Sequence, residues 1–297
     1  SWDRRAFRLF QAGAVLKLPI RMIVLYRLLF LPGLLLVLPY YLFRMWRRGG
    51  YREGFGNRFG RMRGVPPKQA GCLRIWIQAV SVGEILALHP LLKRIRDRKD
   101  VEVILTTTTS TGFALLKQME PGLATWYGVF PLDFLPFSRR DWRALQPDRI
   151  VLMEGELWPE HLHQARRRGV PAVLINGRLS DRSFRRYRRM GGLPRVFFSQ
   201  LEAIHAGSPT DRDRFDQLGW IPPDRIFQTG NLKLDLEKDD PLSEEAYQTL
   251  LQELGFADGR DDGPDPLILL GSSTWPGEER ILVEAFLALK EAFPALH

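Results

Sequence analysis

The chain has 297 residues, of which 45% are hydrophobic and 26% are charged, and its formal net charge is +9. This length accommodates two domains of ordinary size, and the abundance of apolar residues excludes a largely disordered chain. The single cysteine, Cys72, excludes an internal disulfide framework and a cysteine-based zinc site. His161 and His163 are two residues apart and would not share a helix face, so we expect no metal site.

The positive charge is concentrated in two segments. Residues 1–65 carry thirteen Lys and Arg against two acidic residues, and residues 166–195 carry ten Arg against one Asp, so the rest of the chain is net acidic. Such patches indicate an anionic partner. The Arg-rich run 183–189 lacks the stacked aromatics of RNA-binding modules, and the first patch surrounds a lipid-like segment. We therefore expect a membrane partner and no nucleic acid.

The lipid-like segment is Leu28–Phe43, sixteen residues without a charge. As a helix it would span about 24 Å, which is short for a bilayer crossing, and Pro32 and Pro39 would bend it. Arginines flank it on both sides and can reach lipid headgroups. No small-residue cleavage site marks a signal peptide. We expect residues 1–48 to be a membrane anchor, either single-pass or half-inserted; the alternative is a buried core helix.

After Pro66 and Pro67, short β-rich runs alternate with helical periodicity. The helical segments include 85–95 and Gly112–Met119. Alternation of this kind predicts an α/β fold whose mostly parallel sheet is covered on both faces. The predicted strands are Leu73–Val80, Val101–Thr107, Ile150–Met153, Ala172–Ile175, Ala203–Ala206 and Ile226–Gln228.

A second unit follows a polar, Pro-containing linker. We predict a helix over 243–254, a strand over Leu267–Leu270 and a helix over 276–293, which together make one β-α step of a new sheet. Two Rossmann-like units facing across a cleft form the GT-B architecture. Because the chain ends just after a helical pattern, we expect the second domain to be incomplete. The expected divisions are the anchor (1–48), a first domain (49–232) and the start of a second domain (233–297).

The first chemical motif, Ser81-Val82-Gly83-Glu84, follows the first predicted strand. Ligands of parallel α/β sheets bind at this carboxyl edge, where Glu84 could take a proton from an attacking hydroxyl. The same Ser-x-x-Glu spacing is also a helix capping box, with Ser81 as the N-cap. On spacing alone, the cap is favoured.

Two further motifs follow later strands. Glu154 and Glu156 could bind a cationic group or orient sugar hydroxyls, and Arg178 could clamp a phosphate or carboxylate. Equally, the two carboxylates could form an acidic loop before a helix that starts at Pro159, and Arg178 could be a solvated surface residue.

In the second unit, small hydroxyl residues precede the last helix. Ser272, Ser273 and Thr274 at a helix start suit a phosphate, while Glu278 and Glu279 would repel it unless they face ribose hydroxyls. Helix capping explains the same residues equally well, and the lysine of a P-loop is missing.

In order along the chain, these segments resemble the Kdo (3-deoxy-D-manno-octulosonic acid) transferases of lipopolysaccharide synthesis. The resemblance covers nearly everything from about residue 24 onward; each motif is weak alone, and the ordered series is specific. After the hydrophobic N-terminus, the matching segments are Tyr51–Gly60, Ser81–Glu84, Thr106–Gly112, Glu154–Pro159, Asn176–Ser180, Gly230–Asp235 and Ser272–Glu279.

The resemblance implies a GT-B enzyme of the inner (cytoplasmic) membrane, with its catalytic domains on the cytoplasmic face. CMP-Kdo would be the donor and a lipid A precursor, lipid IVA, the acceptor, with an inverting mechanism and no cofactor. It also implies that Glu84 is the catalytic base, which overturns the preference for a purely structural cap. We assign the remaining site residues to acceptor and cleft binding (Ser81, Gly83, Glu154, Glu156, Arg178) and to donor binding (Lys233, Ser272, Ser273, Thr274, Glu278).

The sequence departs from the family pattern at several positions. Gly155 stands where Thr is usual, Glu160 where Asn is usual, Gly177 where Ala is common and Trp275 where His is common, so we expect side-chain contacts there to differ. Two other functions stay open. One is a GT-B transferase that uses another nucleotide sugar, and the other is a non-enzymatic, membrane-associated binder of anionic lipid.

Overall fold

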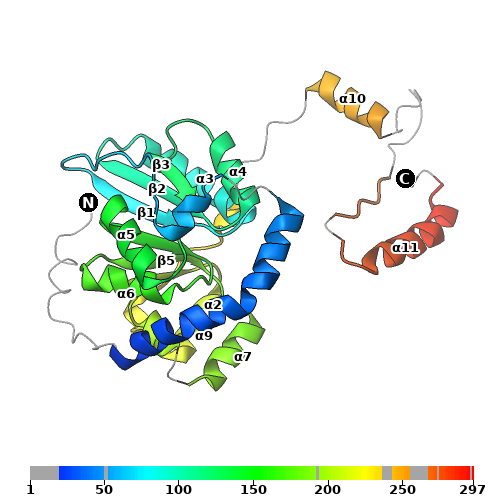
Figure 1. The fold of residues 1–297 in the computed structure, drawn as a ribbon. Coiled ribbons are helices and arrows are strands. Elements are labelled where there is room, and N and C mark those ends of the chain that lie inside the picture. Colours follow the sequence, from blue (N-terminus) through cyan, green and yellow to red (C-terminus); the bar gives the residue numbers. More distant parts are fainter. Residues whose placement is uncertain are drawn as a thin grey trace. The chain divides into compact units, whose positions relative to one another are not determined.

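A computed structural model describes residues 20–49, 53–191, 194–235, 243–254, 267–272, 274–294 and 296–297 (Figure 1). The chain divides into two compact units, Ser1–Glu237 and Lys238–His297. Each unit is described by itself.

The first unit is built on a seven-stranded sheet in the order β3-β2-β1-β4-β5-β6-β7, in which every neighbouring pair is parallel. The sheet first grows outward from β1 to β3, and then continues on the other side of β1 with β4. The order therefore reverses between β1 and β4. The strands are β1 (Leu73–Gln78), β2 (Val101–Thr107), β3 (Trp126–Val129), β4 (Arg149–Met153), β5 (Ala172–Gly177), β6 (Ala203–Ala206) and β7 (Ile226–Gln228).

Helices cover both faces of this sheet. Because side chains alternate along a strand, Trp76 and Ile77 of β1 enter two different apolar cores. The Ile77 core includes residues of α3 and α4, whereas the Trp76 core includes residues of α5, α6, α8 and α9. The helices are α3 (Val82–Arg96), α4 (Ser110–Gln118), α5 (Leu135–Leu145), α6 (Pro159–Arg167), α7 (Asp181–Arg189), α8 (Arg195–Phe198) and α9 (Pro209–Leu218), with 3-10 turns η2 (Phe55–Phe59), η3 (Pro223–Arg225) and η4 (Leu232–Leu234).

The predicted α/β class and six predicted strands are confirmed, with ends that differ by at most two residues. The strand that we did not predict is β3, a four-residue segment that contains Gly128. It pairs with β2 alone among the described strands, so it is an edge strand without a long apolar run.

A long N-terminal helix, α2 (Ile20–Arg48), packs through its first part against the rest of the first unit. The Tyr26 hydroxyl donates to the Asp133 carboxylate at 2.7 Å, and Phe30 stacks on Phe134 with ring centroids 5.2 Å apart. Arg27 donates two hydrogen bonds to the Glu160 carboxylate, at 2.8 and 3.0 Å. Asp133 and Phe134 lie in the loop before α5, and Glu160 is in the first turn of α6. These contacts bind α2 to both helices.

The rest of α2 presents apolar side chains to the outside. Leu36 is 83% exposed and Trp46 is 81% exposed. The segment Met22–Arg47 is long and apolar enough to cross a membrane, and 6% of its apolar 18-residue window is buried, which argues against the alternative of a core helix. Pro32 and Pro39 lie inside the helix and do not end it, and Figure 1 shows that α2 is bent.

The second unit contains α10 (Glu244–Glu253) and α11 (Glu278–Ala292), in agreement with the two predicted helices. The predicted strand Leu267–Leu270 is wrong. Within the described residues, this run forms one isolated bridge, between Leu267 and Leu296. An apolar run becomes a strand only when neighbouring strands pair with it, and Leu270 here is 80% exposed.

The Arg27–Glu160 pair gives a test of how α2 is held. Glu160 is fully buried, so Arg27→Met should leave an uncompensated charge and lower the free energy of unfolding by about 3 kcal/mol. The double variant Arg27→Met/Glu160→Gln should recover most of this loss, because the buried charge is gone. Denaturant unfolding in a mild detergent, followed by tryptophan fluorescence, measures both. A single variant as stable as the parent would show that the pair does not hold α2.

Candidate functional site

The carboxyl ends of β1 and β4 lie side by side where the strand order reverses. In doubly wound sheets the connections after two such strands leave to opposite faces, which opens a crevice that binds ligands. Glu84 lies in the first turn of α3, directly after β1, and Glu154 follows β4. The predicted acidic residues therefore come together at the topological switch point of the sheet.

The capping box expected at Ser81–Glu84 is present. Ser81 is the N-cap of α3, and its hydroxyl oxygen accepts from the Glu84 backbone N–H at 3.3 Å. In return, the Glu84 carboxylate accepts from the Val80 backbone N–H at 2.8 Å and from the Ser81 hydroxyl at 3.1 Å. These bonds fix both oxygens of a buried carboxylate. A carboxylate has about four acceptor positions, so Glu84 retains room for a substrate proton.

The electrostatic environment makes Glu84 more basic than an ordinary glutamate. Burial raises its pKa, and the charge of Glu154 raises it further; the bonds from Val80 and Ser81 and the charge of Lys233 act in the opposite direction. The pKa of Glu156 is also raised, by burial and then by the charges of Glu84 and Glu154. The charge of Glu154 therefore acts on Glu84, and the charges of Glu84 and Glu154 act on Glu156.

Two cations face this acidic cluster. The Lys233 ammonium lies 2.7 Å from Oε1 of Glu154, and an Arg178 guanidinium nitrogen lies 4.0 Å from the same oxygen. Lys233 belongs to η4, which packs against α3. Lys233 was assigned to donor binding, and the structure places it among the residues assigned to the acceptor and cleft.

Asn176 was not predicted as a site residue, but it positions the turn that carries Lys233. Its side-chain oxygen accepts from the Leu232 backbone N–H at 3.3 Å, which ties the end of β5 to the turn that carries Lys233. Asn176 has φ +49° and Glu154 has φ +56°, a left-handed conformation that residues other than glycine rarely adopt. A strained backbone at two adjacent strand ends is typical of functional sites. An Asn-Gly pair directly after a predicted strand was the available signal.

The glycines that depart from the family pattern differ in their surroundings. A Cβ at Gly155 would lie 3.5 Å from the Arg178 carbonyl oxygen, which is an ordinary van der Waals contact. A Cβ at Gly177 would lie 3.1 Å from Ile204 and 3.2 Å from Phe215, so even alanine would require a small shift. At Gly83 a Cβ would meet only the Lys233 side chain, at 4.0 Å.

In the second unit, the residues just before α11 contact the first turn of this helix. The Glu278 carboxylate accepts from the Trp275 backbone N–H at 2.8 Å, and Glu279 accepts from the Thr274 hydroxyl at 2.7 Å. Neither bond caps α11, because the N-cap of this helix is Gly277 and no described side chain forms a cap hydrogen bond there, so the capping alternative is not observed. Ser272 is exposed in the segment before α11, and Ser273 lies outside the described residues.

His161, which follows Glu156 by five residues, has a structural role. His161 is buried, and its Nδ1 accepts from the Trp142 indole N–H at 3.2 Å. Burial lowers its pKa to about 3, so the ring is neutral. Among the described residues, there is no group of three or more His, Cys, Asp or Glu that could hold a metal ion.

Residues 53–236 match the family model described as 3-deoxy-D-manno-octulosonic-acid transferase (kdotransferase). The chain belongs to the Kdo transferase family. It is 33% identical over 252 residues to the 3-deoxy-D-manno-octulosonic acid transferase of Haemophilus influenzae, covering 83% of this chain and 55% of that protein. It is 34% identical over 256 residues to the transferase of the same name from Bordetella pertussis, covering 83% and 56%. The chain therefore spans about half the length of these curated relatives.

Solved structures place this Kdo transferase chain in the GT-B fold class. UDP-GlcNAc 2-epimerase from Neisseria meningitidis, bound to UDP-GlcNAc, gives a TM-score of 0.52 at 14% identity, over 75% of this chain and 64% of that chain. Anabaena HepE, in complex with UDP and glucose, gives 0.50 at 17% identity, over 75% and 59%. At such identities the likeness concerns the fold alone.

The charge of Lys233 gives a test of the acidic cluster. Because this charge lowers the pKa of Glu84, Lys233→Met should raise that pKa further. The charge-conserving Lys233→Arg is the control and should shift it less. Carbon-13 NMR titration of labelled glutamate side chains measures the pKa, and Glu84→Gln assigns the signal. If the pKa of Glu84 is the same in Lys233→Met and Lys233→Arg, the charge of Lys233 does not influence this carboxylate.

Proposed function

We propose that this Kdo transferase moves Kdo from CMP-Kdo to a lipid A precursor, lipid IVA, in lipopolysaccharide synthesis, with inversion at the anomeric carbon. The observation that carries the proposal is the buried Glu84 carboxylate, fixed by two hydrogen bonds at the switch point of the sheet. Membership of the Kdo transferase family supports the sugar and the reaction class.

The proposed reaction is a single displacement. An acceptor hydroxyl attacks the anomeric carbon of Kdo, Glu84 takes the hydroxyl proton, the bond to the CMP phosphate breaks, and CMP leaves with the bonding electrons. A raised pKa strengthens Glu84 as a proton acceptor near neutral pH. Its bonds to Val80 and Ser81 hold the carboxylate in one orientation, so little reorganisation is needed at the moment of transfer. Lys233 and Arg178, which face Glu154, would orient charged or hydroxyl groups of the substrates.

The proposed location is the inner membrane, with the catalytic domains on the cytoplasmic face. The apolar, exposed part of α2 supports attachment to a bilayer. Docking of its first part on the loop before α5 and on α6 would then hold the sheet close to the membrane that contains the lipid acceptor.

Glu84→Gln tests the catalytic assignment. The experiment uses the protein extended to the full length of its relatives. Glutamine cannot take the proton, so transfer should fall by roughly 10²–10⁴-fold. Its amide oxygen can still accept from the Val80 N–H and its NH2 group can donate to the Ser81 hydroxyl oxygen, so thermal stability and CMP-Kdo binding should stay close to those of the parent. Transfer close to the parental rate would remove Glu84 as the base and make Glu154 or Glu156 the next candidate.

Nucleotide protection tests the donor. A GT-B transferase of another nucleotide sugar is the second candidate, since the solved structures that share the fold include complexes with UDP-GlcNAc and UDP. If the donor is CMP-Kdo, the native protein binds CMP more tightly than UMP or UDP. CMP should therefore raise the melting temperature of the extended protein more than UMP or UDP does at equal concentration. Stronger protection by UMP or UDP would favour the second candidate.

A further inference from the structure

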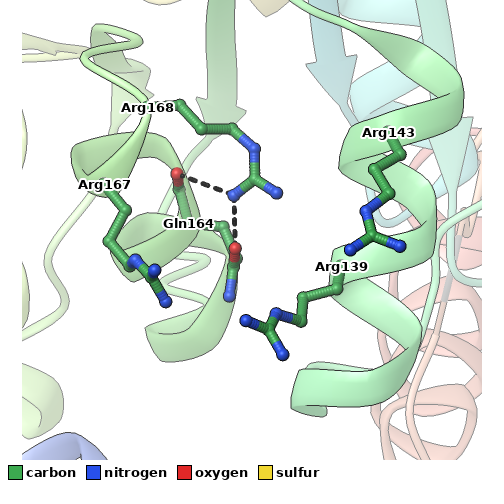
Figure 2. Close-up of a pocket in the computed structure, with 5 residues that line it drawn as sticks. All are labelled: Arg139, Arg143, Gln164, Arg167 and Arg168. Carbon is green, nitrogen blue, oxygen red and sulfur yellow. Dashed lines mark hydrogen bonds between the residues drawn. The ribbon is translucent and has the colours of Figure 1, made fainter.

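A cavity of about 240 Å³ lies between α5 and α6, and four arginines line it (Figure 2). Arg139 and Arg143 come from α5, while Arg167 and Arg168 come from the end of α6; Gln164 completes the lining. Figure 2 shows that the guanidinium groups of the two helices extend toward the gap between them. Four positive charges therefore converge on one small space.

These charges are poorly compensated by the protein. Arg139, Arg143 and Arg167 form no ion pair with a carboxylate among the described residues. Arg168 is held in place, because it donates to the Gln164 backbone and side-chain oxygens and lies over the Trp142 ring at 5.3 Å. Burial lowers the pKa of Arg168, and the charges of the other three arginines lower it further, whereas the charge of Glu160 acts in the opposite direction. A bound anion would remove this repulsion.

The cavity is separate from the acidic cluster. Helix α6 begins at Pro159, shortly after Glu156, and Arg167 ends it. Nine helical residues span about 13 Å, so Arg167 and Arg168 lie toward the opposite edge of the sheet from Glu84. The arginines therefore do not contribute to the proton transfer proposed for Glu84.

A chain of hydrogen bonds connects the cavity to α2. Arg168 donates to Gln164, Gln164 donates to the Glu160 carboxylate at 2.6 Å, and Arg27 of α2 donates to the same carboxylate. The cavity thus lies beside the place where the apolar helix is attached. If α2 enters a bilayer, the anions nearest to this place are the phosphates of lipid headgroups.

We propose that Arg139, Arg143, Arg167 and Arg168 form a site for the phosphate headgroup of an anionic membrane phospholipid, distinct from the acceptor site. The planar guanidinium fork matches phosphate oxygens bidentately. At about 240 Å³ the cavity is smaller than pockets that enclose a whole drug-sized ligand, about 300–1,000 Å³, which suits a headgroup whose acyl chains stay outside. The proposal rests on the proposed membrane location of α2.

The test measures lipid binding to the full chain in an uncharged detergent. Short-chain phosphatidylglycerol should raise the melting temperature in a saturable manner, and phosphatidylcholine with the same chains should not. Arg143→Gln/Arg167→Gln should weaken the affinity for phosphatidylglycerol about 30-fold, because each lost charge is worth roughly 5-fold. Neither side chain has a partner among the described residues, so the unliganded variant should remain folded.

The matched control is Arg94→Gln/Lys99→Gln. It removes the same charge near the end of α3, in the layer that covers the other face of the sheet, and it should leave the affinity unchanged. Equal binding of phosphatidylcholine, or unchanged affinity in the Arg143/Arg167 variant, overturns the proposal. Inorganic phosphate that protects as well as phosphatidylglycerol at equal concentration assigns the cavity to a soluble anion and also overturns it. Lipid binding is measured without the donor and without transfer. If transfer depends on Glu84 but phosphatidylglycerol does not bind, the lipid site is overturned and the proposed function stands.

Discussion

The handedness of the crossovers determines where every functional feature of the first unit lies. Strands β1 to β3 progress in one direction along the sheet and β4 to β7 in the other, so right-handed connections place α3 and α4 on one face and α5 and α6 on the opposite face. The loops after β1 and β4 consequently diverge, and Glu84 and Glu154 occupy the crevice between them. The same rule makes α5 and α6 neighbours, which creates both the docking place of α2 and the arginine-lined cavity.

Buried carboxylates stabilise the start of two helices in this unit, one on each face. Glu84 belongs to its own helix and accepts from the Val80 N–H, whereas Asp133 comes from a different loop and accepts from the N–H groups of Glu160 and His161 at 3.0 and 2.9 Å. Positive helix N-termini favour such groups. At α3 burial and the nearby Glu154 keep the carboxylate basic, so a structural cap and a proton acceptor are compatible in one residue.

Local patterns predicted those features that depend on local sequence. Apolar runs located six strands, and the Ser81–Glu84 spacing indicated both a cap and a base, of which the cap is observed. Local patterns could not predict which segments pair as strands. Leu267–Leu270 is as apolar as the predicted strands but lacks neighbouring strands among the described residues. Charge counting grouped Arg167 and Arg168 with the arginines of α7, whereas the fold joins them to Arg139 and Arg143 from an earlier helix. A composition count cannot anticipate that association.

The contacts of α2 connect the proposed membrane helix to the geometry of the acidic motif. Tyr26 and Arg27 bind Asp133 and Glu160, and Asp133 in turn fixes the backbone of the first turn of α6. This turn follows the Glu154–Glu156 segment after two residues, so displacement of α2 would release constraints close to the proposed site. Removing residues 1–48 would do more than remove the proposed anchor, because the buried Glu160 would lose its counter-ion Arg27. The helix that is proposed to enter the bilayer is therefore also a structural element of the domain that carries the chemistry.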